Sequence, residues 1–169
     1  INAHLDYRIG RALFAIKTAE SLSRSLELHT PPLVEVILPL VESAEDMLKV
    51  HQAYQALQGL DHRLFNLSSN QNGQIGVIPI FEKVETLFKV KQILKNYLIG
   101  YKKQYGKLPE YVRPFSARSD PALNSGLIPA VIANKVALGQ YYQLSEETKV
   151  PIYPIIGPGA LPFRGLLTP

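Results

Sequence analysis

The stretch "IGVIPIF" at residues 75–81 is a short apolar run, rich in β-branched residues, that ends directly at the carboxylate of Glu82. A run of this length without polar alternation is typical of a strand that is buried on both faces of a parallel sheet. Polar sequence precedes it at 68–74, and we expect a helix over 84–104 to follow it. A buried strand that leads into a helix is the repeating unit of parallel α/β proteins.

The same strand and helix unit recurs on both sides of this stretch. Ser43 and Asp46 stand in capping-box spacing and predict the start of a helix. The other predicted elements are an amphipathic helix over 10–27, a strand over 34–40, a helix from about Ser43 to about Leu57, a strand over 111–116, a helix over 127–143 and a strand over 150–156. Four strands that alternate with helices predict right-handed crossovers and a parallel sheet, so the fold class is α/β.

The pattern leaves two arrangements of these β/α units open. A doubly wound nucleotide-binding sheet lacks support, because no strand end carries GxGxxG or GxxxxGK[ST]. Part of a (β/α)8, TIM-like barrel accounts for the spacing better, although periodicity alone does not separate the two. We therefore expect residues 1–169 to form one domain that is part of a barrel. The chain begins at Ile1 rather than Met, and we expect it to be an excerpt from a longer protein.

Composition narrows the class of protein. With 46% hydrophobic and 19% charged residues, the chain is typical of a globular protein. The absence of cysteine excludes disulfides, thiolate metal sites and a cysteine nucleophile, and it favours a reducing compartment. No apolar run reaches membrane-spanning length, so no membrane partner is expected. The net charge of +4 is concentrated in lysines between 83 and 107, which fit a solvated helix face; without a nucleic-acid motif, no nucleic-acid partner is expected.

Charged side chains occur where each predicted strand ends. In parallel α/β folds the loops that leave the carboxyl ends of the strands meet at one face, where ligands bind. In chain order these exits carry Glu42, Glu82, Arg118 with Asp120, and Arg164. Two carboxylates from different strands suit Mg²⁺ or Mn²⁺, and flanking guanidinium groups suit a phosphate or carboxylate ligand. The sequence therefore predicts a metal and anion site at this face.

Each of these residues also has a structural interpretation. Glu82 fits an acid in the first turn of a helix, and Asp120 fits an N-cap that precedes a proline. We assign Glu42 to a structural role, because Ser43 already supplies the cap of its helix. An arginine in a loop is usually solvated, but the glycines around Arg164 permit a close approach of the backbone to a ligand. Spacing alone leaves these alternatives open.

The histidines offer less. None of His4, His29, His51 and His62 lies at the carboxyl end of a predicted strand. We therefore expect surface or packing roles for them, and a Ser-His-Asp set is not supported.

Four blocks of sequence carry a resemblance to a known family. They are "EVILPL" at 35–40 with "SAEDM" at 43–47, "IPIFEKVETL" at 78–87, "RPFSARSDPALNSGLIPAV" at 113–131 and "YPIIGPGALPFRG" at 153–165. In this order they resemble the archaeal-type phosphoenolpyruvate carboxylase family, the short form that is also found in some bacteria. ARSDPALN together with LPFRG is the specific part of the match. The chain departs from the family pattern at 40–42, at Ser116 and at Ser125.

The resemblance implies roles for five residues. Glu82 and Asp120 correspond to the ligands of a divalent metal, Mg²⁺ or Mn²⁺. Arg164 corresponds to a catalytic arginine that contacts phosphate or bicarbonate, and Arg118 and Asn124 to substrate contacts, with Arg118 also catalytic. The implied reaction is carboxylation of phosphoenolpyruvate by bicarbonate, through carboxyphosphate and the pyruvate enolate, to give oxaloacetate and phosphate.

The resemblance also implies a cytoplasmic homo-oligomer, a tetramer. The catalytic histidine of the family, in a QHPD-type motif, has no counterpart in this sequence, so we expect the 169 residues alone to be inactive. Two alternatives stay open. One is another metal-dependent barrel enzyme, such as a lyase, that binds pyruvate or phosphoenolpyruvate. The other is a basic interaction module without enzymatic activity.

Overall fold

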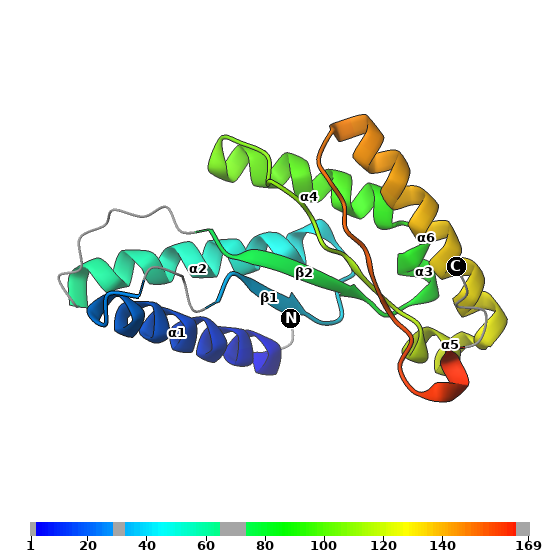
Figure 1. Cartoon of the computed structure of the whole chain (residues 1–169), viewed down its shortest axis with the longest axis horizontal. Coiled ribbons are helices and arrows are strands. Elements are labelled where there is room, and N and C mark those ends of the chain that lie inside the picture. The colour runs from blue at the N-terminus through cyan, green and yellow to red at the C-terminus, as the bar shows by residue number, and fades with distance from the viewer. Residues whose placement is uncertain (1–2, 29–32, 65–73, 165–169) are drawn as a thin grey trace. The chain divides into compact units, whose positions relative to one another are not determined.

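Helices alternate with parallel strands in the computed structural model, which describes residues 3–28, 33–64 and 74–164 (Figure 1). The elements are α1 (Ala3–Ser25), β1 (Glu35–Leu38), α2 (Ala44–Leu64), β2 (Gly76–Phe81), α3 (Val84–Leu87), α4 (Val90–Tyr105), β3 (Phe115–Ala117), α5 (Ser119–Ser125), α6 (Leu127–Thr148), β4 (Ile155–Gly157) and the 3-10 helix η1 (Leu161–Phe163). The sheet has the order β1-β2-β3-β4. This confirms the predicted α/β class with four parallel strands.

The helix predicted over 84–104 is interrupted. α3 ends at Leu87 and α4 begins at Val90. The side chain of Gln140, from α6, bonds to the backbone on both sides of the break: its Nε2 donates to the Phe88 carbonyl at 2.8 Å, and its Oε1 accepts from the Lys91 N–H at 2.9 Å. A tertiary contact thus satisfies backbone groups at the break, and local periodicity gives no sign of it.

The last two strands are shorter than the sequence predicts. β3 and β4 pair over three residues each, and an isolated parallel bridge between Val112 and Ile152 precedes them. Pro114 and Pro154 lie between the bridge and the strands. Proline lacks the N–H that a sheet ladder requires, and β3 and β4 each begin directly after one of these prolines, whereas β2 continues through Pro79.

The described residues divide into two compact units. The first combines residues 1–36 with 49–76, and the second combines 37–48 with 77–169. In the first unit, the Tyr54 hydroxyl of α2 donates a hydrogen bond to Glu20 of α1. The buried Lys17 ammonium lies 2.7 Å from the other oxygen of Glu20 and 4.2 Å from the centre of the Tyr54 ring. These contacts compensate the buried charge of the lysine.

In the second unit, α6 is the helix that the other elements share. It contacts α3, α4, α5 and β3. Three of its alanines, Ala130, Ala133 and Ala137, are 0% exposed and follow each other at helical spacing. Small side chains at these positions let neighbouring backbones approach α6 closely. The helix is thereby placed beside the strand ends that carry the predicted site.

His51 has a packing role, as expected. It lies within α2 and is 0% exposed. Desolvation by burial lowers its pKa from the ordinary value of 6.5 to about 4. The side chains of His4, His29 and His62 lie outside the described part of the chain.

Burial of His51 predicts a specific loss of stability in acid. Between pH 6.5 and 4 the unfolded chain binds more protons at this residue than the folded chain, so its contribution is complete above pH 6.5 and falls as the pH drops. We expect the free energy of unfolding to decrease by about 2 kcal/mol from pH 7.5 to pH 5 on account of this group. Urea unfolding of the wild type and of His51→Gln at both pH values measures it; an equal decrease in the variant would contradict the assignment.

Candidate active site

The carboxyl ends of β2, β3 and β4 lie at one edge of the sheet. Phe81 pairs with Ser116, and Ala117 pairs with Gly157, so the three strands end at nearly the same level. Glu82 follows β2 directly, and Asp120 lies three residues beyond the end of β3. Strand pairing therefore delivers both predicted metal ligands to the same edge.

Glu82 and Asp120 interact electrostatically. Partial burial raises the pKa of Glu82, and the negative charge of Asp120 raises it further. A hydrogen bond from the Leu40 N–H opposes both effects by stabilising the ionised form. The two carboxylates are thus brought together from the exits of different strands, and the charge of Asp120 disfavours ionisation of Glu82.

Leu40 supplies its N–H from an uncommon backbone conformation. Its φ of 56° lies in the left-handed region, which costs a residue with a side chain about 1–2 kcal/mol. The next residue is fixed by a hydrogen bond from the Val41 N–H to the Ile80 carbonyl at 3.1 Å. The exit of β1 is thereby tied to β2, and the Leu40 N–H is directed to the Glu82 carboxylate. No feature of the sequence marks this conformation.

A glycine loop packs against the helix turn that carries Asp120. Gly159 has a φ of 69°, and a side chain there would bring its Cβ within 2.8 Å of the Ser119 Cβ. Arg164 is exposed, and its Nε donates to the Gly159 carbonyl at 3.3 Å. The loop that holds Arg164 therefore lies beside the first turn of α5 because glycine leaves room for it.

The other two predicted substrate contacts differ in exposure. Arg118 is 2% exposed and occupies the position before α5. Asn124 is exposed near the end of α5. Substrate contact by either residue stays a prediction. The alternative interpretation of Asp120 as an N-cap is wrong, because α5 begins at Ser119 and no side chain caps it.

The structural role assigned to Glu42 stays a prediction, with which its contacts agree. Its carboxylate pairs with Lys83 at an exposed position. The predicted capping box is present: the Ser43 N–H donates to Asp46 at 2.9 Å, and the Asp46 N–H donates to the Ser43 hydroxyl at 3.4 Å. Asp46 also accepts a hydrogen bond from the Glu42 N–H at 3.1 Å, so the helix start uses the side chains of Ser43 and Asp46 and only the backbone of Glu42.

The residues at this edge fit a magnesium-like ion. Within residues 3–28, 33–64 and 74–164, no group of three or more His, Cys, Asp and Glu residues is arranged to hold a metal. Mg²⁺ needs fewer protein ligands than that, because it keeps several waters and takes one or two carboxylates plus substrate oxygens. A cation between Glu82 and Asp120 would also remove the repulsion that raises the pKa of Glu82. The donor set is unlike that of a structural zinc site.

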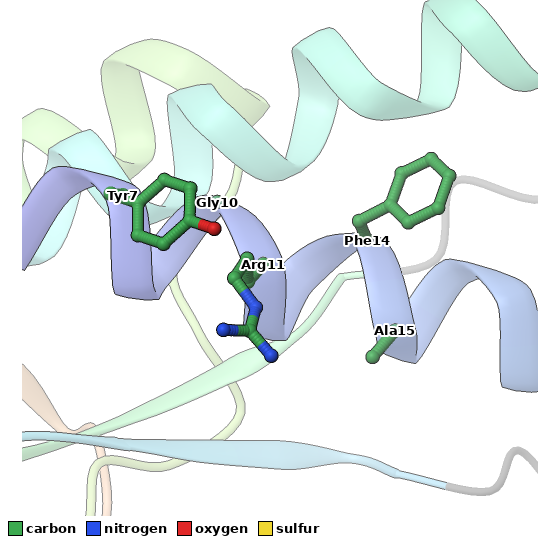
Figure 2. A pocket seen from close by; sticks show the side chains of 5 residues that line it. All are labelled: Tyr7, Gly10, Arg11, Phe14 and Ala15. Atoms are coloured by element: carbon green, nitrogen blue, oxygen red, sulfur yellow. The ribbon is translucent and has the colours of Figure 1, made fainter.

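A concave surface lies in the first unit, on α1. It has a volume of about 500 Å³ and is lined by Tyr7, Gly10, Arg11, Phe14 and Ala15 (Figure 2). All five residues come from one helix, and Arg11 carries the only charge among them, 5.8 Å from the centre of the Tyr7 ring. This lining offers no carboxylate or imidazole to a metal, so it does not compete with the strand ends as a metal site.

Comparison with known proteins decides the family. The family profile described as "Phosphoenolpyruvate carboxylase" matches residues 10–169. This chain belongs to the phosphoenolpyruvate carboxylase family. Membership confirms the resemblance that the four sequence blocks indicated.

Three phosphoenolpyruvate carboxylases illustrate the similarity. Those of Pyrococcus horikoshii and Pyrococcus abyssi are 43% and 41% identical to this chain over 145 residues, which are 82% of the chain and 30% of each protein. That of Oenococcus oeni is 34% identical over 163 residues, which are 96% of the chain and 32% of that protein. The chain spans about a third of the length of these relatives.

Sequence reasoning missed two polar contacts between α6 and β3. The Ser116 and Tyr141 hydroxyls are 2.8 Å apart and buried, and Asn134 donates a hydrogen bond to the Ala117 carbonyl. Ser116 is a position at which we expect a departure from the family pattern, and the structure gives it Tyr141 as a hydrogen-bond partner. A signal for Asn134 existed: an amide among apolar residues inside a helix is unfavourable unless it bonds to something.

Two glycines with different surroundings, Gly157 at the end of β4 and Gly139 inside α6, predict opposite effects of substitution by alanine. In Gly157→Ala the new Cβ would lie 2.1 Å from the Phe115 ring, so we expect a loss of about 1–3 kcal/mol of stability. Gly139→Ala, inside α6, meets no described atom within 4 Å, and we expect a gain of about 0.5–1 kcal/mol. Chemical denaturation of both variants tests this; a neutral Gly157→Ala would contradict the tight contact.

Proposed function

We propose that the complete protein is a phosphoenolpyruvate carboxylase, which forms oxaloacetate and phosphate from phosphoenolpyruvate and bicarbonate. The observation that carries this proposal is the pairing of Glu82 with Asp120 at adjacent strand ends, beside the glycine loop of Arg164. Family membership supports the same reaction. The two substrates are anions, so a site that unites them must supply positive charge.

The residues of this chain divide that task. Glu82 and Asp120 would hold Mg²⁺ or Mn²⁺, which when bound supplies positive charge to substrate oxygens, including the enolate oxygen as it forms. The Leu40 N–H donates to the Glu82 carboxylate and favours its ionised form against burial and the charge of Asp120. Arg164 presents an exposed guanidinium, which suits bidentate contact with phosphate or bicarbonate. Arg118 and Asn124 complete the proposed set of substrate contacts, with Arg118 also catalytic.

The wider architecture forms part of the proposal. We propose that the four strands are a segment of a (β/α)8 barrel, which the remaining two thirds of a full-length relative would complete. A cytoplasmic homotetramer is proposed by resemblance alone. None of the helices in the described residues has the length and apolar character to cross a membrane.

A second enzyme class shares much of this chemistry. Another metal-dependent barrel enzyme that binds pyruvate or phosphoenolpyruvate would use similar acids and arginines. Dependence of oxaloacetate formation on bicarbonate separates the carboxylase from such a lyase.

The basic interaction module receives less support from the structure. Lys91 lies 2.5 Å and Lys95 lies 3.9 Å from carboxylate oxygens of Glu147, and Lys83 pairs with Glu42. These pairs reduce the charge that the lysine-rich segment offers to a polyanion.

Replacement of one proposed ligand tests the metal site. In the complete protein, Asp120→Asn should weaken Mn²⁺ binding at least tenfold and nearly abolish turnover, because the amide lacks the charge that the cation requires. Glu42→Gln is the matched control, since it removes an exposed carboxylate from a neighbouring strand exit and should leave Mn²⁺ affinity within twofold. Titration of Mn²⁺ followed by electron paramagnetic resonance gives both affinities. A folded Asp120→Asn protein with wild-type affinity would remove Asp120 from the site.

The expected location of the catalytic histidine outside this sequence gives a further test. The 169 residues prepared alone should not produce oxaloacetate, whereas the complete protein should do so in a bicarbonate-dependent manner. The four strands alone would leave sheet edges exposed. The 169 residues could still bind a ligand, because binding needs fewer groups than stabilisation of a transition state. NADH oxidation coupled through malate dehydrogenase compares the two proteins. Comparable turnover by the short chain would show that the catalytic groups are misassigned, and inactivity of both would count against the carboxylase.

A further inference from the structure

Asn134 connects α6 to the strand that precedes Asp120. Its side chain is 5% exposed, and its Nδ2 donates two hydrogen bonds. One bond goes to the Ala130 carbonyl one turn earlier in α6, at 2.9 Å, and the other crosses to the Ala117 carbonyl at 3.1 Å. Ala117 is the last residue of β3. The amide thus uses both of its hydrogens, and one of them fixes the end of a strand.

The other half of the amide is not satisfied in the same way. The Oδ1 of Asn134 is buried and has no hydrogen-bond partner among the described residues. A buried acceptor without a donor is unfavourable, and leucine has nearly the same shape without that cost. Packing alone therefore does not explain an asparagine here. What asparagine supplies and leucine lacks is the donor to the Ala117 carbonyl.

The Ala117 carbonyl lies at the start of the turn that leads to Asp120. Ala117 pairs with Gly157, and the next N–H, that of Arg118, donates to the Gly157 carbonyl at 3.0 Å. The turn is therefore bonded to β4 on one side and to Asn134 on the other. α5 begins immediately afterwards, at Ser119, and carries Asp120 in its first turn. A shift of the Ala117 peptide would change the direction in which α5 begins.

We propose that Asn134 is a positioning residue, which holds the Ala117 carbonyl so that the turn after β3 directs the Asp120 carboxylate toward the metal shared with Glu82. The inference rests on the proposed function. Outer groups that orient a ligand typically contribute a factor of ten to a hundred to metal affinity. Removal of the Asn134 donor should therefore weaken metal binding without removing a ligand.

A second contact between the same two elements provides the control. Tyr141 of α6 shares a buried hydrogen bond with Ser116, the residue before Ala117. Tyr141→Phe removes that bond but leaves the Ala117 carbonyl and its amide donor in place. If the contacts between α6 and β3 only stabilise the fold, loss of either one should change Mn²⁺ affinity to the same extent. If Asn134 positions the Asp120 turn, only its replacement should weaken Mn²⁺ binding.

The experiment uses the complete protein and Mn²⁺ as the probe. Asn134→Leu and the smaller Asn134→Ala remove the donor, so that one variant serves if the other does not fold, and Asn134→Gln retains an amide. Mn²⁺ dissociation constants come from electron paramagnetic resonance, and thermal unfolding is followed by circular dichroism. We expect at least tenfold weaker binding for the Leu and Ala variants, partial recovery for Gln, and a change within twofold for Tyr141→Phe despite a lower unfolding temperature.

Three outcomes would overturn the proposal. A folded Leu or Ala variant that binds Mn²⁺ within twofold of the wild type would exclude positioning by Asn134. Equal weakening in Tyr141→Phe would reduce the effect to general stability. If the Asn134 variants keep their Mn²⁺ affinity while Asp120→Asn loses it, only this inference fails. If the wild type does not bind Mn²⁺ through Asp120, both the proposed function and this inference fail.

Discussion

Two negative charges that the fold brings together at neighbouring strand ends are the constraint on which the site depends. Glu82 is partly withdrawn from water and faces the charge of Asp120, and both effects favour its neutral form. The chain opposes them with a backbone N–H, and it obtains that N–H from a leucine in the left-handed region. Backbone strain of this kind persists where the surrounding structure fixes it and tends to occur at functional sites. The strand ends are therefore organised around a charge that a cation would neutralise.

The surroundings of the site are mostly backbone. Gly159 makes room for the turn of Ser119, Arg164 folds back onto the Gly159 carbonyl, and Asn134 holds the carbonyl of Ala117. The acceptors in these two hydrogen bonds are backbone carbonyls, whereas the donors are the specific side chains of Arg164 and Asn134.

Much of the site was accessible from the sequence because it follows from strand pattern. Buried parallel strands have a recognisable composition, and the rule that their exits converge is enough to predict that Glu82 and Asp120 lie together. The rule fails where a distant side chain decides local structure. Nothing near Phe88 indicates that the helix stops there, and nothing near Leu40 indicates a positive φ. Prolines explain only part of the strand bounds: β3 and β4 begin directly after Pro114 and Pro154, whereas β2 continues through Pro79.

The break between α3 and α4 has a consequence for recombination among relatives. At that break the side chain of Gln140 makes two hydrogen bonds to the backbone, one to the Phe88 carbonyl and one to the Lys91 N–H. Gln140 lies 49 residues beyond Lys91 in the sequence. The residue that stabilises the break between α3 and α4 therefore lies in another helix, α6. In a chimaera that takes α3 and α4 from one parent and α6 from another, these two hydrogen bonds form only if the second parent also provides glutamine at position 140. A crossover point between Tyr105 and Leu127 would take the α3–α4 break from one parent and the residue at position 140, which stabilises it, from the other.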